Sequence, residues 1–156
     1  MIKSLHIFDM DGTIVDSSHR YRTGPCGTRI DLEFWIANEH KVLEDSLLPM
    51  IDRYRELLED PSAYVVIATA RLWCDLTAEF VRMHNIEPQA KIARLNRQDI
   101  RGGAALKITG IKKLLNLKQF HNLQEIHVYE DNIDYLRDLC DMFNAEGHYF
   151  PSAQGH

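Results

Sequence analysis

Two aspartates near the start of the chain have the types and spacing needed for phosphate chemistry. The apolar run at residues 5–8 is followed by Asp-Met-Asp-Gly-Thr, in which Asp9 and Asp11 are the acids and Gly12 permits a tight turn close to an anion. Carboxylates this close repel one another unless a hard cation lies between them, and oxygen ligands favour Mg2+. With the charge neutralised, one carboxylate can attack phosphorus to give an aspartyl-phosphate intermediate. The sequence therefore predicts magnesium-dependent phosphate chemistry at this loop.

Alternating strands and helices are expected to position the loop. Runs rich in apolar and β-branched residues predict strands at 5–8, 64–68, 91–95, 125–129 and 148–150. Amphipathic patterns predict helices between them, at 50–58, 72–84, 107–117 and 133–143. The alternation indicates an α/β fold, a three-layer Rossmann-like parallel sheet of about five strands with helices on both faces.

Polar residues follow three of the predicted strands. In parallel sheets of this kind, ligands bind beyond the carboxyl ends of the strands. The residues at those ends are Asp9 and Asp11, Thr69 and Arg71, and Glu130 and Asp131. Because these strand ends meet at one edge of the sheet, we expect the side chains to converge on a single site.

In their order and context, these residues resemble the four motifs of the haloacid dehalogenase (HAD) superfamily of phosphohydrolases. The matching segments are 9–13, 66–71, Lys107 and 128–131, and together they span most of the chain. The resemblance implies a HAD-type fold, a Mg2+ cofactor and a phosphorylated substrate. It also implies that Asp9 is the nucleophile, while Asp11 protonates the leaving oxygen and later activates water.

The resemblance extends to the remaining site residues. It implies catalytic roles for Asp9, Asp11, Thr69 and Lys107, phosphate contacts from Gly12, Thr13, Ala70 and Arg71, and metal binding by Asp9, Asp11, Glu130 and Asp131. Thr69 and Lys107 would stabilise phosphoryl charge. Lys107 is preferred to the two later lysines because a residue at the start of a helix points toward the strand ends.

Two assignments stay open at this point. Glu130-Asp131 stands where paired aspartates are more common in the superfamily, so the direct metal ligand is ambiguous, with Asp131 favoured. Arg71 fits equally well as a contact to the substrate phosphate or as a partner in a structural ion pair.

The length of the chain suits one catalytic domain. Its 156 residues, 45% of them hydrophobic, predict a single domain at 1–150 and a flexible tail at 151–156. About 55 residues separate the first motif from the second, too few for a folded cap domain beside the expected helix. We therefore expect little or no cap and an open site.

The distribution of charge bears on the substrate. The net charge of −5 argues against a protein that coats nucleic acid through bulk electrostatics. Basic residues nevertheless surround the predicted opening: His19, Arg20, Arg22, Arg29, Lys91, Arg94, Arg97 and Arg101. A basic rim favours a nucleotide or a nucleic-acid terminal phosphate as substrate. The alternatives are a phosphatase of sugar phosphates or phosphoproteins, and a non-catalytic binding module with the same fold.

Other features point to no further chemistry. The three cysteines form no CxxC pair, which favours a reducing compartment over a disulfide framework or zinc knuckle. We find neither a secretory leader nor the roughly 18 apolar residues of a membrane span, so we expect a cytoplasmic protein without a membrane partner. Six histidines, including His127 and His148, share no metal-ligand spacing and receive no role. The oligomeric state is not predicted.

Overall fold

The protein contains one five-stranded parallel sheet, described here from a computed structural model that covers residues 1–27 and 29–152. The strands follow the order β5-β4-β1-β6-β7, and every pairing is parallel. Their bounds are β1 (Ser4–Phe8), β4 (Ala63–Leu72), β5 (Ala90–Arg94), β6 (Glu125–Glu130) and β7 (Glu146–Tyr149). The predicted α/β sheet is confirmed. Most of the predicted tail at 151–156 lies outside the described residues.

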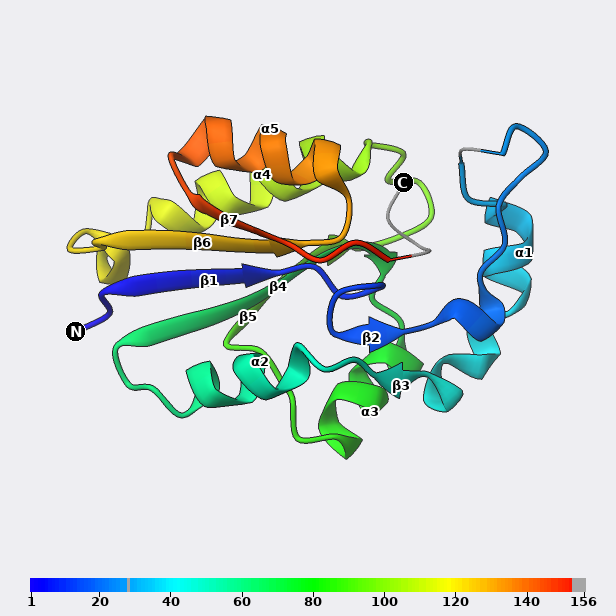
Figure 1. Cartoon of the computed structure of the whole chain (residues 1–156), viewed down its shortest axis with the longest axis horizontal. Coiled ribbons are helices and arrows are strands. Elements are labelled where there is room, and N and C mark those ends of the chain that lie inside the picture. The colour runs from blue at the N-terminus through cyan, green and yellow to red at the C-terminus, as the bar shows by residue number, and fades with distance from the viewer. Residues whose placement is uncertain (28, 153–156) are drawn as a thin grey trace.

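Four helices cover the two faces of the sheet. They are α2 (Ile51–Leu58), α3 (Asp75–Met83), α4 (Gly103–Leu115) and α5 (Ile133–Phe143). Figure 1 shows α4 and α5 on one face and α2 and α3 on the other. Because successive strand residues point to opposite faces, Ile7 packs toward α4 and α5 while its neighbour Phe8 packs against Tyr54 of α2. The central strand is therefore buried on both faces.

Residues 17–45, with residue 28 not described, form a short excursion that we call the α1 segment. It contains α1 (Leu32–Ala37) and the 3-10 turns η1 (Ser18–Arg20) and η2 (Glu39–Glu44). The antiparallel pair β2 (Val15–Asp16) and β3 (Ser46–Leu47) joins its two ends. Figure 1 places α1 beyond the carboxyl edge of the sheet. Its described residues form no hydrophobic cluster separate from the two that pack on the sheet, in keeping with the prediction of little or no cap.

Two element boundaries differ from the prediction at places that matter for the site. β4 continues to Leu72 instead of ending at residue 68, because a register shift against β5 lets the chain stay extended past Ala68. α4 begins at Gly103, four residues before the predicted start. A Cβ atom at Gly103 would lie 2.7 Å from the Tyr135 hydroxyl, so a side chain there would force Tyr135 to shift.

Among the described residues, no helix is both long and apolar enough to cross a membrane.

Candidate active site

Asp9 lies where β1 ends and is held in place from several sides. Its backbone N–H donates to the Tyr129 carbonyl at 2.9 Å, which fixes the loop against β6. One carboxylate oxygen accepts from the Thr13 hydroxyl at 3.2 Å, and the other accepts from Lys107 Nζ at 3.1 Å. The same Nζ donates to Glu130 at 2.7 Å. The ends of β1 and β6 and the first turns of α4 thus bring Asp9, Glu130 and Lys107 into one buried cluster.

Three acidic side chains form a group that fits a divalent cation. Asp9, Glu130 and Asp131 each offer an oxygen, and these oxygens lie within 4.8 Å of one another. Burial and the Asp9 charge raise the pKa of Glu130 to about 7, although Lys107 opposes the rise. Burial and Asp9 likewise raise the pKa of Asp131 to about 9. A single lysine does not balance three carboxylates, so the group suits a hard cation with oxygen ligands.

The Asp11 side chain points to a different set of partners. Arg71 Nε donates to Asp11 Oδ2 at 3.0 Å, and a second guanidinium nitrogen donates to Oδ1. The Ser17 hydroxyl also donates to Oδ1, at 2.8 Å. Burial opposes ionisation of Asp11, but the charge and hydrogen bonds of Arg71 outweigh it and hold the pKa below its ordinary value. The carboxylate of Asp11 is therefore not part of the cation-binding group.

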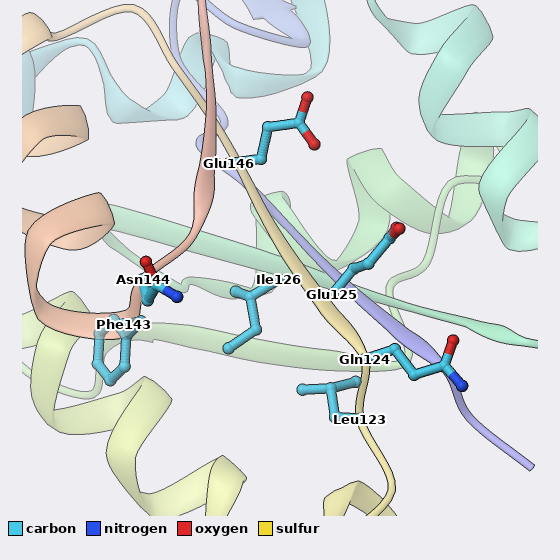
Figure 2. Close-up of a pocket in the computed structure, with 7 residues that line it drawn as sticks. All are labelled: Leu123, Gln124, Glu125, Ile126, Phe143, Asn144 and Glu146. Atoms are coloured by element: carbon cyan, nitrogen blue, oxygen red, sulfur yellow. The ribbon is translucent and has the colours of Figure 1, made fainter.

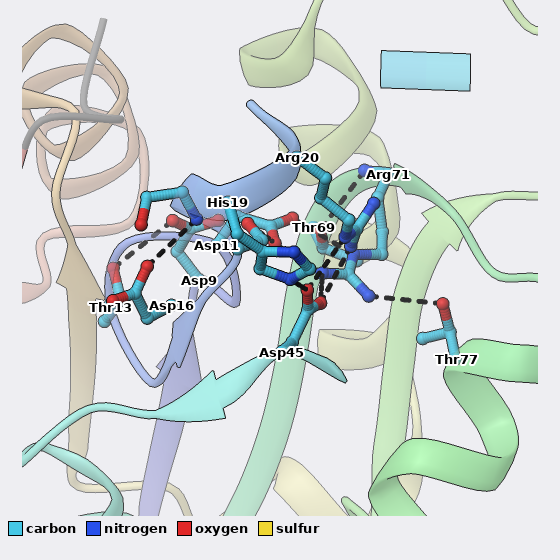
Figure 3. A network of polar contacts seen from close by, with 12 residues as sticks. Asp9, Asp11, Thr13, Asp16, His19, Arg20, Asp45, Thr69, Arg71 and Thr77 are labelled. Atoms are coloured by element: carbon cyan, nitrogen blue, oxygen red, sulfur yellow. Dashed lines mark hydrogen bonds and ion pairs between the residues drawn. The ribbon is translucent and has the colours of Figure 1, made fainter. Parts of the chain in front are cut away.

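Arg71 links Asp11, which is partly exposed, to a buried network centred on Asp45 (Figure 3). Arg20 donates two hydrogen bonds to the Asp45 carboxylate, both at 2.8 Å, and His19 Nε2 lies 2.7 Å from the same group. Arg71 approaches Asp45 at 3.4 Å. The prediction that Arg20 lies on an exposed rim is wrong: the side chain is 1% exposed because Asp45 compensates its charge inside the protein.

Sequence reasoning missed Asp45, and no local motif marks it. The residue lies at the end of the α1 segment, 26 positions from its partner Arg71. Asp45 could be found only from the fold, because the two guanidinium groups it compensates need a counter-charge only once they are buried. Ser152 was also missed, and its hydroxyl donates to Asp131 Oδ2 at 2.6 Å.

Thr69 and Ala70 lie inside β4, because the strand is longer than predicted. The Thr69 hydroxyl accepts from the backbone N–H of Arg71 at 3.1 Å, within the part of the strand where the register against β5 shifts. The Ala70 carbonyl accepts from Arg94 Nε at 2.7 Å, so that rim arginine is partly used in holding the strand. Lys107, one turn into α4, still reaches Asp9.

Gly12 permits the close approach of the loop to Asp131. Its φ is +84°, and an added Cβ would lie 2.0 Å from Asp131 Oδ2. We expect Gly12→Ala to lower the free energy of unfolding by about 2–4 kcal/mol, from the left-handed backbone plus the clash. Gly27→Ala is the matched control: φ is +75°, nothing lies within 4 Å, and the backbone alone costs about 1 kcal/mol. Urea unfolding of both variants measures the difference, and equal losses would contradict the clash.

A cavity of about 860 Å³ opens above these residues. Every predicted site residue except Gly12 and Thr13 lines it: Asp9, Asp11, Thr69, Ala70, Arg71, Lys107, Glu130 and Asp131. The α1 segment supplies a mainly apolar wall, with Tyr21, Ile30, Leu32 and Trp35. A second hollow, of about 320 Å³, lies at the other end of β6 and contains none of the predicted residues (Figure 2). The chemistry-bearing groups and the larger cavity thus coincide.

The fold and site place the protein in the HAD class of phosphohydrolase folds, as the motifs predicted. The features that do so are the sheet order, the Asp-x-Asp loop after the central strand, and the lysine and acids that face this loop. The family model described as the Bacteriophage T5 5'-deoxynucleotidase matches residues 1–102. The chain belongs to this family. The match includes the Asp9 loop and Thr69-Ala70-Arg71, whereas Lys107, Glu130 and Asp131 lie beyond it.

Relatives and solved structures agree with this placement. The 5'-deoxynucleotidase of Escherichia phage T5 is 34% identical over 77 residues, which make up 46% of this chain and 31% of that protein. The match thus spans about a third of the relative's length. A chain of the Pnkp1/Rnl/Hen1 RNA repair complex superposes with a TM-score of 0.69 at 15% identity, covering 96% of this chain and 43% of its own. The HAD domain of effector protein Lem4 from Legionella pneumophila gives 0.62 at 11% identity, covering 99% and 88%. These structures share the fold.

Proposed function

We propose that the protein is a magnesium-dependent phosphomonoesterase that acts on a nucleotide, and that residues 1–150 form its single catalytic domain. The observation that carries the proposal is the position of Asp9, 8% exposed on the floor of the cavity between Lys107 and the acids Glu130 and Asp131. The Asp9 carboxylate faces the cavity, and Lys107 supplies a positive charge beside it. Mg2+ held by Asp9, Asp131 or Glu130 and the Asp11 backbone would neutralise the site so that a phosphate dianion can approach.

In the proposed mechanism, a carboxylate oxygen of Asp9 attacks phosphorus as the bond from phosphorus to the leaving oxygen breaks. Asp11 gives its proton to that oxygen, which leaves as an alcohol, and the phosphoryl group stays on Asp9. Asp11, now a base, takes a proton from water, which attacks the phosphoryl group and regenerates Asp9 with release of phosphate. Lys107 and Thr69 stabilise charge on the transferred group.

Asp11 needs a proton for the first step, and Arg71 opposes it. In the resting arrangement Asp11 is ionised, because Arg71 and Ser17 hold its pKa low. We propose that the phosphate of the substrate draws Arg71 away from Asp11, since a dianion competes for the same guanidinium. Burial of the released carboxyl then favours its protonated form. In this proposal Arg71 forms the ion pair with Asp11 before the substrate binds and contacts the substrate phosphate afterwards, so both of its open assignments apply in turn.

The cavity supports a nucleotide as substrate. Its volume of about 860 Å³ lies within the range of small-molecule sites, and one side is charged while the other is mainly apolar. Trp35 and Tyr21 on the apolar wall pack edge to face at 6.4 Å, which gives a rigid surface for a base. Membership of the T5 5'-deoxynucleotidase family points to a deoxynucleoside monophosphate.

Phosphate release from a substrate panel tests the proposal. The panel holds deoxynucleoside and nucleoside 5'-monophosphates, oligonucleotides phosphorylated at the 5' or 3' end, and sugar phosphates, each with Mg2+ or EDTA. We expect Mg2+-dependent release that is fastest from deoxynucleoside monophosphates. Faster release from oligonucleotide ends would move the substrate to nucleic acid. No release from any member would contradict the enzymatic proposal and favour a binding module.

Added Mg2+ should stabilise the protein more at pH 8 than at pH 5.5. In the folded, metal-free protein the pKa of Asp131 is about 9, above its ordinary value. Between the ordinary and the raised pKa, the folded protein therefore binds more protons than the unfolded chain. Its free energy of unfolding falls as the pH rises through this range. A cation that binds the ionised carboxylates offsets this loss. Melting temperatures with Mg2+ and with EDTA measure the effect, and Asp131→Asn should largely remove it. An equal Mg2+ shift in the variant would contradict the assigned site.

A further inference from the structure

A second group of possible metal ligands lies on β6 and β7, apart from the Asp9 cluster. His127, Glu146 and His148 each bring one nitrogen or oxygen within 4.8 Å of the others. His127 and His148 are 21 residues apart, which is why no sequence motif revealed them. Parallel pairing sets His127 opposite Glu146 and His148 opposite Tyr129, and strand alternation then places the three side chains on one face.

The contacts of His127 leave one ring nitrogen facing other electron-pair donors. Its Nε2 lies 3.0 Å from Glu125 Oε2, a carboxylate that can only accept, so Nε2 carries the proton. In a neutral ring, Nδ1 then presents a lone pair to His148 Nε2 at 3.0 Å and to Glu146 Oε2 at 3.4 Å. A neutral His148 that carries its proton on Nε2 can donate to this lone pair, and a metal ion can take the place of that proton between the same atoms. A metal-bound histidine whose other nitrogen donates to a carboxylate is a recurrent feature of zinc sites.

Neighbouring aromatic rings hold the two histidine ligands in position. His6 stacks on His127 with ring centroids 4.7 Å apart, and Tyr129 stacks on His148 at 4.4 Å, so both ligand rings are held in plane. Two imidazoles beside the carboxylates of Glu125 and Glu146 form a donor set whose negative charge a divalent ion balances.

We propose that His127, Glu146 and His148 bind a first-row transition-metal ion of the Zn2+ class. Imidazole ligands distinguish this site from the all-oxygen Asp9 cluster, which suits Mg2+. The Glu146 side chain is 67% exposed and offers a path of entry. Figure 2 shows Glu125 and Glu146 on the same side of the two strands, opposite Phe143. The proposal does not depend on the enzymatic activity.

The ion would fix β7 against β6 next to the active-site acids. Beyond the site, the Phe150 N–H donates to the Glu130 carbonyl at 3.0 Å, and the Ser152 hydroxyl donates to Asp131. Three ligands from two adjacent strands therefore hold the segment that leads to Ser152. The site acts as a structural clamp whose effect reaches Asp131.

Zinc competition against a chromophoric chelator tests the site, with tag-free protein and excess Mg2+ to occupy the Asp9 cluster. We expect one Zn2+ per wild-type chain, and binding at least about ten-fold weaker in His148→Ala and in Glu125→Gln, which removes the orienting carboxylate. His121→Ala, which changes an exposed histidine elsewhere, and Asp131→Asn should both bind as wild type does. Equal affinity in His148→Ala and His121→Ala, or loss only in Asp131→Asn, would overturn the proposal.

Co2+ added to the wild-type protein gives a second measurement that needs no variant. Visible absorption bands of tetrahedral Co2+, displaced by one equivalent of Zn2+, are the expected result. Absence of these bands, or a doubly protonated His127 in nitrogen NMR at pH 7 with Zn2+ present, would show that a proton occupies the site and would overturn the proposal.

Discussion

Asp9→Asn should lower phosphate release by about 10³-fold or more while leaving the fold intact. The amide cannot attack phosphorus, and Asp9 is the carboxylate that directly follows the central strand, lines the cavity and contacts Lys107. Lys107 keeps its 2.7 Å contact with Glu130 in the variant, so no buried cation is left without a partner. Initial rates with the best substrate of the panel, together with circular dichroism, measure both effects.

Asp138→Asn is the matched control for this result. It removes the same charge from an exposed position on α5, away from the cavity, and should leave the rate unchanged. A well-folded Asp9→Asn protein that retains more than a tenth of the wild-type rate would rule out Asp9 as the nucleophile. Reduced rates in both variants would indicate that general electrostatics, not covalent catalysis, underlies the effect.

Asp45→Asn should be the most destabilising single change of a charged residue in the α1 segment. Asp45 is fully buried and compensates two buried guanidinium groups, those of Arg20 and Arg71. Removing one member of such a network costs about 3–5 kcal/mol, because the remaining charges stay in the interior without compensation. Urea unfolding measures the loss. Asp45 does not itself line the cavity but contacts Arg71, which does, so any fall in activity would act through Arg71 and Asp11.

The exposed pair of Arg53 and Glu56 provides the comparison for Asp45. Its atoms are 3.3 Å apart, yet both side chains are at least half exposed, so Glu56→Gln should cost less than about 1 kcal/mol. A loss from Asp45→Asn no larger than that from Glu56→Gln would mean that water reaches the network and screens its charges.

The sheet and its polar edge could be predicted because they depend on local patterns. The apolar runs before Asp9 and before Glu130 mark buried parallel strands, and the rule that ligands meet strand ends then brings the two acids together. The start of α4 was placed too late, although Lys107 was chosen correctly as a residue that reaches Asp9. Its place in the second turn depends on Gly103, whose lack of a side chain makes room for Tyr135.

The rest of the site depends on contacts that no local pattern encodes. Asp45 is buried only because the α1 segment folds over Arg71, and Arg20 leaves the expected rim for the same reason. His127 and His148 come together through the register of β6 against β7. In each case the partners are more than 20 residues apart, and the energetics of a buried charge or a shared ion become apparent only in three dimensions.

The central position of β1 has a consequence for biosynthesis. This strand needs β4 on one edge and β6 on the other, and Asp9 meets Lys107 from 98 residues further along the chain. As the ribosome adds about 5–20 residues per second, the nascent polypeptide spends several seconds with one edge of its innermost strand unpaired. Such an edge can recruit strands from other chains. The emerging protein is therefore most exposed to strand pairing with other chains just before residues 125–130 appear, because β6 then covers the open edge of β1.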